Sequence, residues 1–215
     1  MKKFFINSIL ALAILAAAGA AQAITIFHAT LTNDQEVINP PIPNEGSSGF
    51  ATFVLNDAQD RLTYDVQLVG LDLRGVNAAG VPGQAIPGDL NPNDNVTRMH
   101  IHRNKVGLNG NIVFGIIDAN PLLRDDLLDL VIDIPGLHIT GAWDLTEGSQ
   151  VLNQVTNLGN ELANLFAFGL YINVHTSDHP GGEIRGQILP EPDSLALLGI
   201  GALGLFGPAL RRRRA

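Results

Sequence analysis

The chain has 215 residues and no cysteine, which excludes disulfide bonds, catalysis by a thiol and metal sites built from thiolates. Its net charge is −8, but both ends are unusual segments. Removing their six basic and two acidic residues leaves a body, 24–189, with 7 basic and 19 acidic residues and a net charge of −12. Nucleic acid and anionic lipid would repel such a body, so cations are its more natural partners.

The N-terminal end predicts a secretory signal peptide. Two lysines precede an apolar stretch, Phe4–Ala18, and the small-residue motif Ala21-Gln22-Ala23 follows. Cleavage by signal peptidase after Ala23 would start the mature chain at Ile24. A retained membrane anchor is the alternative, although the apolar stretch is short for one.

Alternation of apolar and polar residues predicts β-strands through the body. In 62–71 every second residue is apolar, and the segment 49–57 before it is joined by a polar turn at 57–60, which indicates a hairpin. Further strands are expected at 111–118, 169–176 and 183–189, with His179-Pro180-Gly181-Gly182 turning the last two into another hairpin. That hairpin should bury five apolar side chains: Leu170, Ile172, Val174, Ile184 and Ile188.

Two long segments, 75–96 and 118–148, do not fit strands. The first is rich in Gly, Pro, Asn and Asp, and the second carries an acidic cluster of Asp125, Asp126, Asp129 and Asp133. One helix is expected in 149–166, where apolar residues recur at threes and fours: Val151, Val155, Leu158, Leu162 and Leu165. The fold class is therefore mainly β, a single antiparallel β-sandwich or barrel with long loops, one inserted helix and apolar helices at both termini.

The C-terminal segment, 190–215, has three parts in a fixed order. Pro190-Glu191-Pro192 is followed by an uncharged apolar run, Ser194–Leu210, and then by four arginines. A helix of that run reaches about 25 Å, slightly less than a bilayer core of about 30 Å. The segment resembles the PEP-CTERM sorting signal of Gram-negative bacteria, which implies an inner-membrane-anchored intermediate and cleavage by an exosortase-type protease. A plain C-terminal anchor is the alternative.

Four blocks carry a second resemblance. They are "FHATLTNDQEV", "GFATFVL" with "LTYDVQLVGL", "HIHR…GLNGNIVFGI" and "GLYINVHTSDHPGGEIRGQI", in that order. Together they resemble the CHRD (chordin-type) domains of secreted proteins over about residues 25–189. The resemblance implies a β-sandwich, immunoglobulin-like or similar to Cu/Zn superoxide dismutase, with no established catalytic activity. The 75–96 loop and the 118–168 insertion depart from the short form of the family.

The only His-X-His motif, His100 and His102, places both rings on one face of a strand. His175 lies on the face of its own strand that points away from the core candidates, so all three rings should lie on the outer face of the sheet beneath loops. Three imidazoles suit Cu or Zn, with His179, His28, a carboxylate or water in a fourth position. The layout is similar to the copper ligands of Cu/Zn superoxide dismutases, although the bridging histidine and the zinc-ligand loop are missing. The alternative is three polar side chains hydrogen-bonded to loops.

Other candidate sites are weaker. Asp89, Asn91, Asn93 and Asp94 could offer oxygens to calcium, but Asx turns explain the pattern equally well. Ser177 beside His179 lacks the turn of a hydrolase nucleophile.

Two functions follow. The first is an exported, non-enzymatic interaction module in the cell envelope or extracellular matrix, with polysaccharide or matrix proteins as partners and no nucleic acid. The alternative is a Cu or Zn protein, possible only if His100, His102 and His175 converge within about 4–5 Å of one point.

Overall fold

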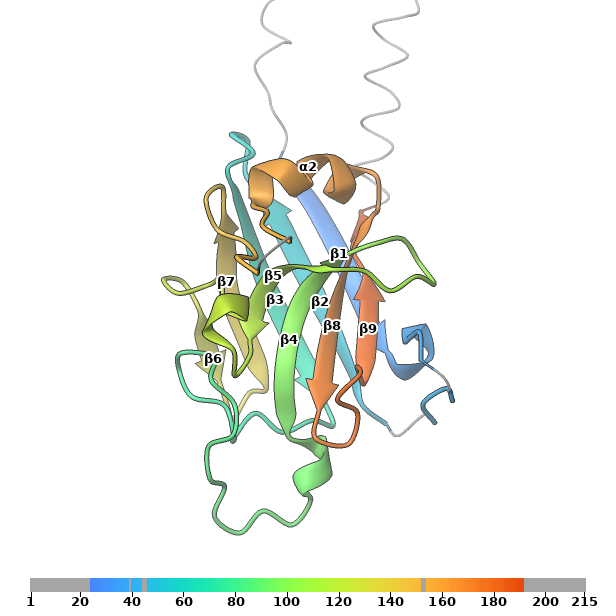
Figure 1. The fold of residues 1–215 in the computed structure, drawn as a ribbon, viewed down its shortest axis with the longest axis vertical. Helices are drawn as coiled ribbons and strands as arrows, with labels where there is room; N and C mark the ends of the chain where they lie inside the picture. Colours follow the sequence, from blue (N-terminus) through green and yellow to red (C-terminus); the bar gives the residue numbers. More distant parts are fainter. Residues whose placement is uncertain (1–23, 39, 44–45, 152–153, 192–215) are drawn as a thin grey trace, which may run out of the picture.

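The computed structural model describes residues 24–38, 40–43, 46–151 and 154–191. Its regular secondary structure is almost entirely β-strand, with one α-helix among the described residues (Figure 1). The strands are β1 (Thr25–Thr32), β2 (Ser48–Leu55), β3 (Arg61–Val69), β4 (Val96–Arg103), β5 (Ile112–Ile117), β6 (Val131–Asp133), β7 (His138–Asp144), β8 (Leu170–Thr176), β9 (Ile184–Gln187) and β10 (Leu189–Pro190). The helix is α2 (Leu158–Phe166), and three short 3₁₀ turns cover Asn33–Gln35, Pro92–Asp94 and Pro121–Leu123.

All the strands belong to one antiparallel sheet, in the order β5-β4-β8-β9-β1-β2-β3-β7-β6, with β10 pairing β1. Of the sandwich or barrel that the sequence predicts, the structure has one sheet that curls into a half-barrel. Its two ends meet across the core, where Phe114 of β5 stacks on Trp143 of β7 with ring centroids 4.9 Å apart. Curling lets one sheet bury its inner face against itself, so no second sheet is needed.

The two predicted hairpins are confirmed. β2 and β3 pair along their whole length, and the apolar residues of β3 point into the core in strict alternation. β8 pairs with β9, and all five side chains predicted for the core of this hairpin are fully buried: Leu170, Ile172, Val174, Ile184 and Ile188. The 75–96 segment is a long loop with one 3₁₀ turn, as expected.

The segment 118–148 was expected to contain no strand, and this is wrong. It forms the hairpin of β6 and β7, and β7 pairs with β3 over seven residues. Gly141 permits this pairing, because a Cβ there would lie 2.2 Å from the Tyr64 hydroxyl. That hydroxyl donates to Asp126 Oδ2 at 2.6 Å, which holds the acidic loop against the sheet.

The structure confirms that a helix is inserted between the strands, but this helix is half as long as predicted. It begins at Leu158, where the Asn157 side chain accepts a hydrogen bond from the Asn160 N–H as an N-cap. Before it the backbone makes other bonds: the Ser149 N–H donates to Val113 O of β5, and Val155 is exposed. The helix lies across one end of the half-barrel (Figure 1).

The signal peptide with its cleavage residue Ala23, and the tail from Pro192 onward, lie outside the described residues, as do the terminal apolar helices. Within the described part of the chain, no helix is long and apolar enough to cross a bilayer. The first two residues of the Pro-Glu-Pro motif are described. Pro190 pairs with Phe27, and Glu191 contacts His28 Nε2 at 2.5 Å.

Candidate metal centre

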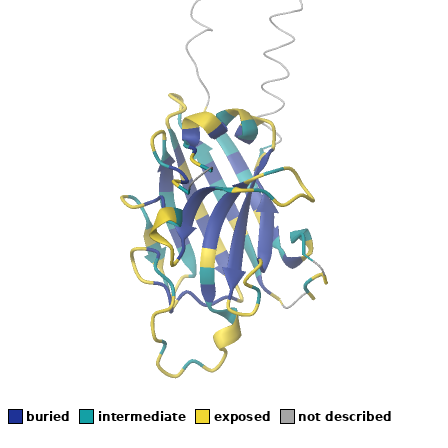
Figure 2. Cartoon of the chain, in the orientation of Figure 1, coloured by how far each residue is buried: buried dark blue, intermediate teal, exposed yellow. Residues whose placement is uncertain are grey.

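His100, His102 and His175 lie together on the outer face of adjacent strands β4 and β8, opposite the core residues Met99 and Ile101. Strand alternation had predicted this side. All three are nevertheless buried, with exposed fractions of 1%, 8% and 6%. Figure 2 shows β8 and much of β4 in the dark colour of buried residues. A polar face of a sheet becomes buried in this way only when loops cover it.

The three side chains converge. One ring nitrogen of each lies within 4.8 Å of those of the other two, and the ring centroids are 5.5 to 6.3 Å apart. Neither His179 nor His28 joins this group. His28 lies on β1, where it instead contacts Thr52 of β2 and Glu191, the residue after β10. The geometric condition set for a metal site is therefore met by three histidines, and neither His179 nor His28 is a fourth ligand.

Each ring is held by a different loop. His100 Nε2 bonds to Asp118 Oδ2 at 2.8 Å, His102 Nδ1 to Gly110 O at 3.0 Å, and His175 Nδ1 to Pro180 O at 3.1 Å. The two carbonyl partners require a proton on the bonded nitrogen, which leaves the second nitrogen of each ring as a lone-pair donor. A carboxylate or carbonyl behind each imidazole is the arrangement that orients histidine ligands in metal sites.

The remaining nitrogens, His100 Nδ1, His102 Nε2 and His175 Nε2, are buried and have no hydrogen-bond partner. Burial also lowers the pKa of His102 to about 3 and that of His175 to about 4, and it lowers the pKa of His100 despite the bond to Asp118. The rings are therefore neutral at pH 7. Buried polar atoms rarely lack a partner, and three that face one another match the lone pairs a metal requires.

Two glycines let the covering loops approach the cluster. A Cβ at Gly115, opposite His100 in β5, would lie 1.7 Å from Leu123 O. A Cβ at Gly110 would lie 1.5 Å from Arg103 O. Any side chain at either position would push away a loop that holds a histidine.

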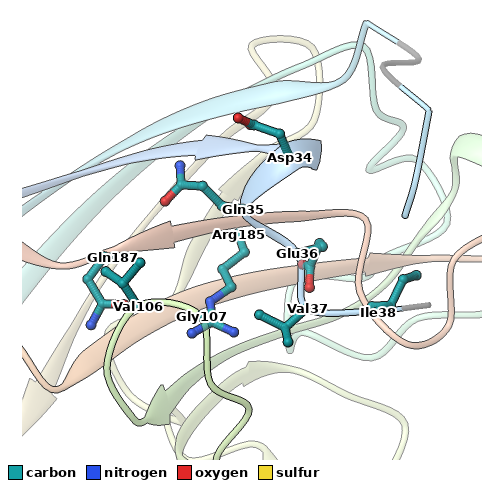
Figure 3. A pocket seen from close by; sticks show the side chains of 9 residues that line it. All are labelled: Asp34, Gln35, Glu36, Val37, Ile38, Val106, Gly107, Arg185 and Gln187. Atoms are coloured by element: carbon teal, nitrogen blue, oxygen red, sulfur yellow. The ribbon is translucent and has the colours of Figure 1, made fainter. Parts of the chain in front are cut away.

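Tyr171 and Arg185 extend the site along the same face. The Tyr171 ring stacks on His102 with centroids 4.9 Å apart, and the Arg185 guanidinium lies 3.4 Å from the Tyr171 centroid. Arg185 also lines a cleft of about 520 Å³ with Glu36, Val106 and other residues (Figure 3). None of the three histidines lines this cleft, so it ends at Arg185.

Other predicted sites do not gather ligands in the described residues. Oxygens of the proposed calcium loop bond within the loop: Asp89 to the Asn91 N–H and the Asn95 side chain, and Asp94 to the Asn91 side chain. Among all the residues that the structure describes, the histidine cluster is the only group of side chains placed to ligate a metal. Asp118 and the two carbonyls were missed as partners, because nothing in the local sequence marks them.

Comparison with known families shows which family the chain belongs to. The sequence model of the CHRD-domain family matches residues 27–188, three quarters of the chain. The chain belongs to the CHRD-domain family. No curated protein and no solved structure matches it. The match covers β2 to β9 in full and most of β1, and it includes all three histidines.

Proposed function

We propose that this CHRD domain is a metal-binding protein that holds one copper or zinc ion through His100, His102 and His175. The observation that carries the proposal is the set of three unpartnered nitrogens, each on a ring whose other nitrogen is fixed by a separate loop. One nitrogen from each ring lies within 4.8 Å of those of the other two, and bonds of about 2.0–2.1 Å to one ion would require the rings to draw together by about 1 Å.

The burial of the cluster supports binding rather than turnover. A catalytic metal keeps an open position for water or substrate, whereas these rings are at most 8% exposed and lie under three loops. We therefore propose a non-enzymatic role, and the dismutase-like alternative is disfavoured.

Export remains part of the proposal. A signal peptide cleaved after Ala23 and a Pro190-Glu191-Pro192 sorting motif would place the domain in the cell envelope or outside the cell, through an inner-membrane intermediate. Signal peptidase and an exosortase-type protease would be its processing partners, and extracellular polysaccharide or matrix proteins its later ones.

The test is the metal content of the purified protein after exposure to Cu or Zn and desalting. We expect one ion per chain, and X-ray absorption should show three imidazole nitrogens at about 2.0 Å. The variant His102→Asn/His175→Asn should retain none, while His138→Asn, which changes a histidine outside the cluster, should bind as the parent does. Equal metal content in all three proteins would rule out the site.

The variant Asp118→Asn tests whether the carboxylate behind His100 strengthens metal binding. It keeps a hydrogen-bonding group behind His100 but removes the negative charge, and such changes typically cost about 10–100-fold in metal affinity. Unchanged affinity would show that Asp118 has no part in binding.

A further inference from the structure

The charges around the histidine cluster restrict which ion it can hold, provided that the proposed function is correct. The three ligands are neutral imidazoles, and the one carboxylate in contact with them is Asp118. Two guanidiniums also act on the cluster. Arg185 reaches it through the Tyr171 stack, and Arg98 donates to Pro180 O at 3.5 Å, the same carbonyl that holds His175.

Arg185 keeps most of its charge near the site, because its hydrogen-bond partners are neutral and burial raises the pKa of the nearby Glu36 to about 7, which leaves that carboxyl only partly ionised at pH 7. It is 2% exposed and donates to Asn109 Oδ1, Lys105 O and Leu108 O. Among the described residues no carboxylate lies within ion-pair distance of it. A cation bound by the histidines is therefore attracted by Asp118 and repelled by two arginines, and Glu36 offsets only part of the charge of Arg185.

The number of ligands points the same way. Zinc in closed sites almost always takes four ligands, and the described residues supply three. Cuprous copper, a monovalent ion with a filled d shell, is stable with three nitrogen ligands. Each added positive charge in a buried place is costly, so the two arginines oppose a divalent ion more than a monovalent one.

We infer that the site prefers monovalent copper over divalent copper and over zinc. The domain would then hold copper in its reduced form, shielded from solvent by the three loops. Neutral ligands, burial and the two arginines all act in this direction.

The experiment uses the full-length protein under anaerobic conditions. Cu(I) affinity is measured in competition with bicinchoninate, Zn(II) affinity in competition with a fluorescent zinc chelator, and the bound copper is titrated against redox mediators. We expect Cu(I) to bind more tightly than Zn(II). Relative to the aqueous ions, Cu(I) should be favoured over Cu(II) by about a hundredfold, which raises the reduction potential by about 120 mV.

A charge variant tests the reason for the preference. Arg98 is exposed, so Arg98→Gln should fold normally and lower the ratio of Cu(I) to Cu(II) affinity severalfold. Arg61→Gln is the matched control, since Arg61 on β3 pairs with Asp129 and Asp144. It should leave the ratio unchanged.

The outcomes separate the two proposals. Tighter binding of Zn(II), a potential below that of the aqueous couple, or an unchanged ratio in Arg98→Gln would overturn the preference for Cu(I) and leave metal binding intact. Failure of every one of these ions to bind would overturn the proposed function itself.

Discussion

Acid should destabilise the metal-free domain through its buried histidines, and the effect can be isolated by removing two of them. His102 and His175 have pKa values of about 3 and about 4 in the folded chain, because burial disfavours their charged form. An unfolded chain returns them to about 6.5. The unfolded state therefore binds more protons below pH 6.5, so stability is full above that pH and is lost as the pH falls toward 4.

The magnitude follows from the size of the shifts. Between pH 7 and pH 5 each of these histidines should cost about 2 kcal/mol of unfolding free energy, or about 4 kcal/mol for the pair. Glu36 and Asp125 act in the opposite direction, because burial raises their pKa values to about 7 and about 6. Their contribution is the same in parent and variant and cancels from the difference.

The assay is urea unfolding with a chelator present, followed by the fluorescence of Trp143, the single and fully buried tryptophan. In His102→Asn/His175→Asn the side-chain amides can still donate to the Gly110 and Pro180 carbonyls. Its free energy of unfolding should fall by about 4 kcal/mol less than that of the parent between pH 7 and pH 5. His138→Asn serves as the control. An equal fall in parent and double variant would refute the assignment of neutral, buried rings.

Three further predictions concern the core, a covering loop and processing. Val174→Asp places a charge in the core and should unfold the domain, whereas His175→Ala on the opposite face should cost only about 1–3 kcal/mol; equal losses in thermal unfolding would contradict the facing of β8. Gly115→Ala should lower the melting temperature and metal affinity together, because its Cβ would meet Leu123 O, and normal values for both would show that the loop yields freely. Protein from the native host should end near Pro190 by mass spectrometry, and extracellular peptides that contain the apolar run after it would show that the tail is retained.

Local patterns in the sequence were sufficient for much of the sheet. Alternation at every second residue depends only on strand geometry, so it predicted which side chains of β3, β8 and β9 face the core. The same rule placed His100, His102 and His175 on the outer face. It could not show that this face is buried, since that depends on how three loops fold over the strands.

Pairing partners decided what the patterns missed. β6 has three residues and forms only because β7 offers it a partner at the edge of the sheet. The first half of the predicted helix is instead tied to β5 through the Ser149 N–H. Backbone hydrogen bonds of this kind join residues far apart in the chain, and no local periodicity records them.

The sequence by itself therefore determined the mainly β class, the CHRD family and the three candidate ligands with their common face. Only the tertiary structure decided that the sheet curls on itself, that a separate loop behind each ring fixes it, and that the free nitrogens converge. A metal site depends on where side chains meet in space. Asp118, Gly110 and Pro180 reach the histidines through the folding of loops, and their positions in the sequence give no indication of it.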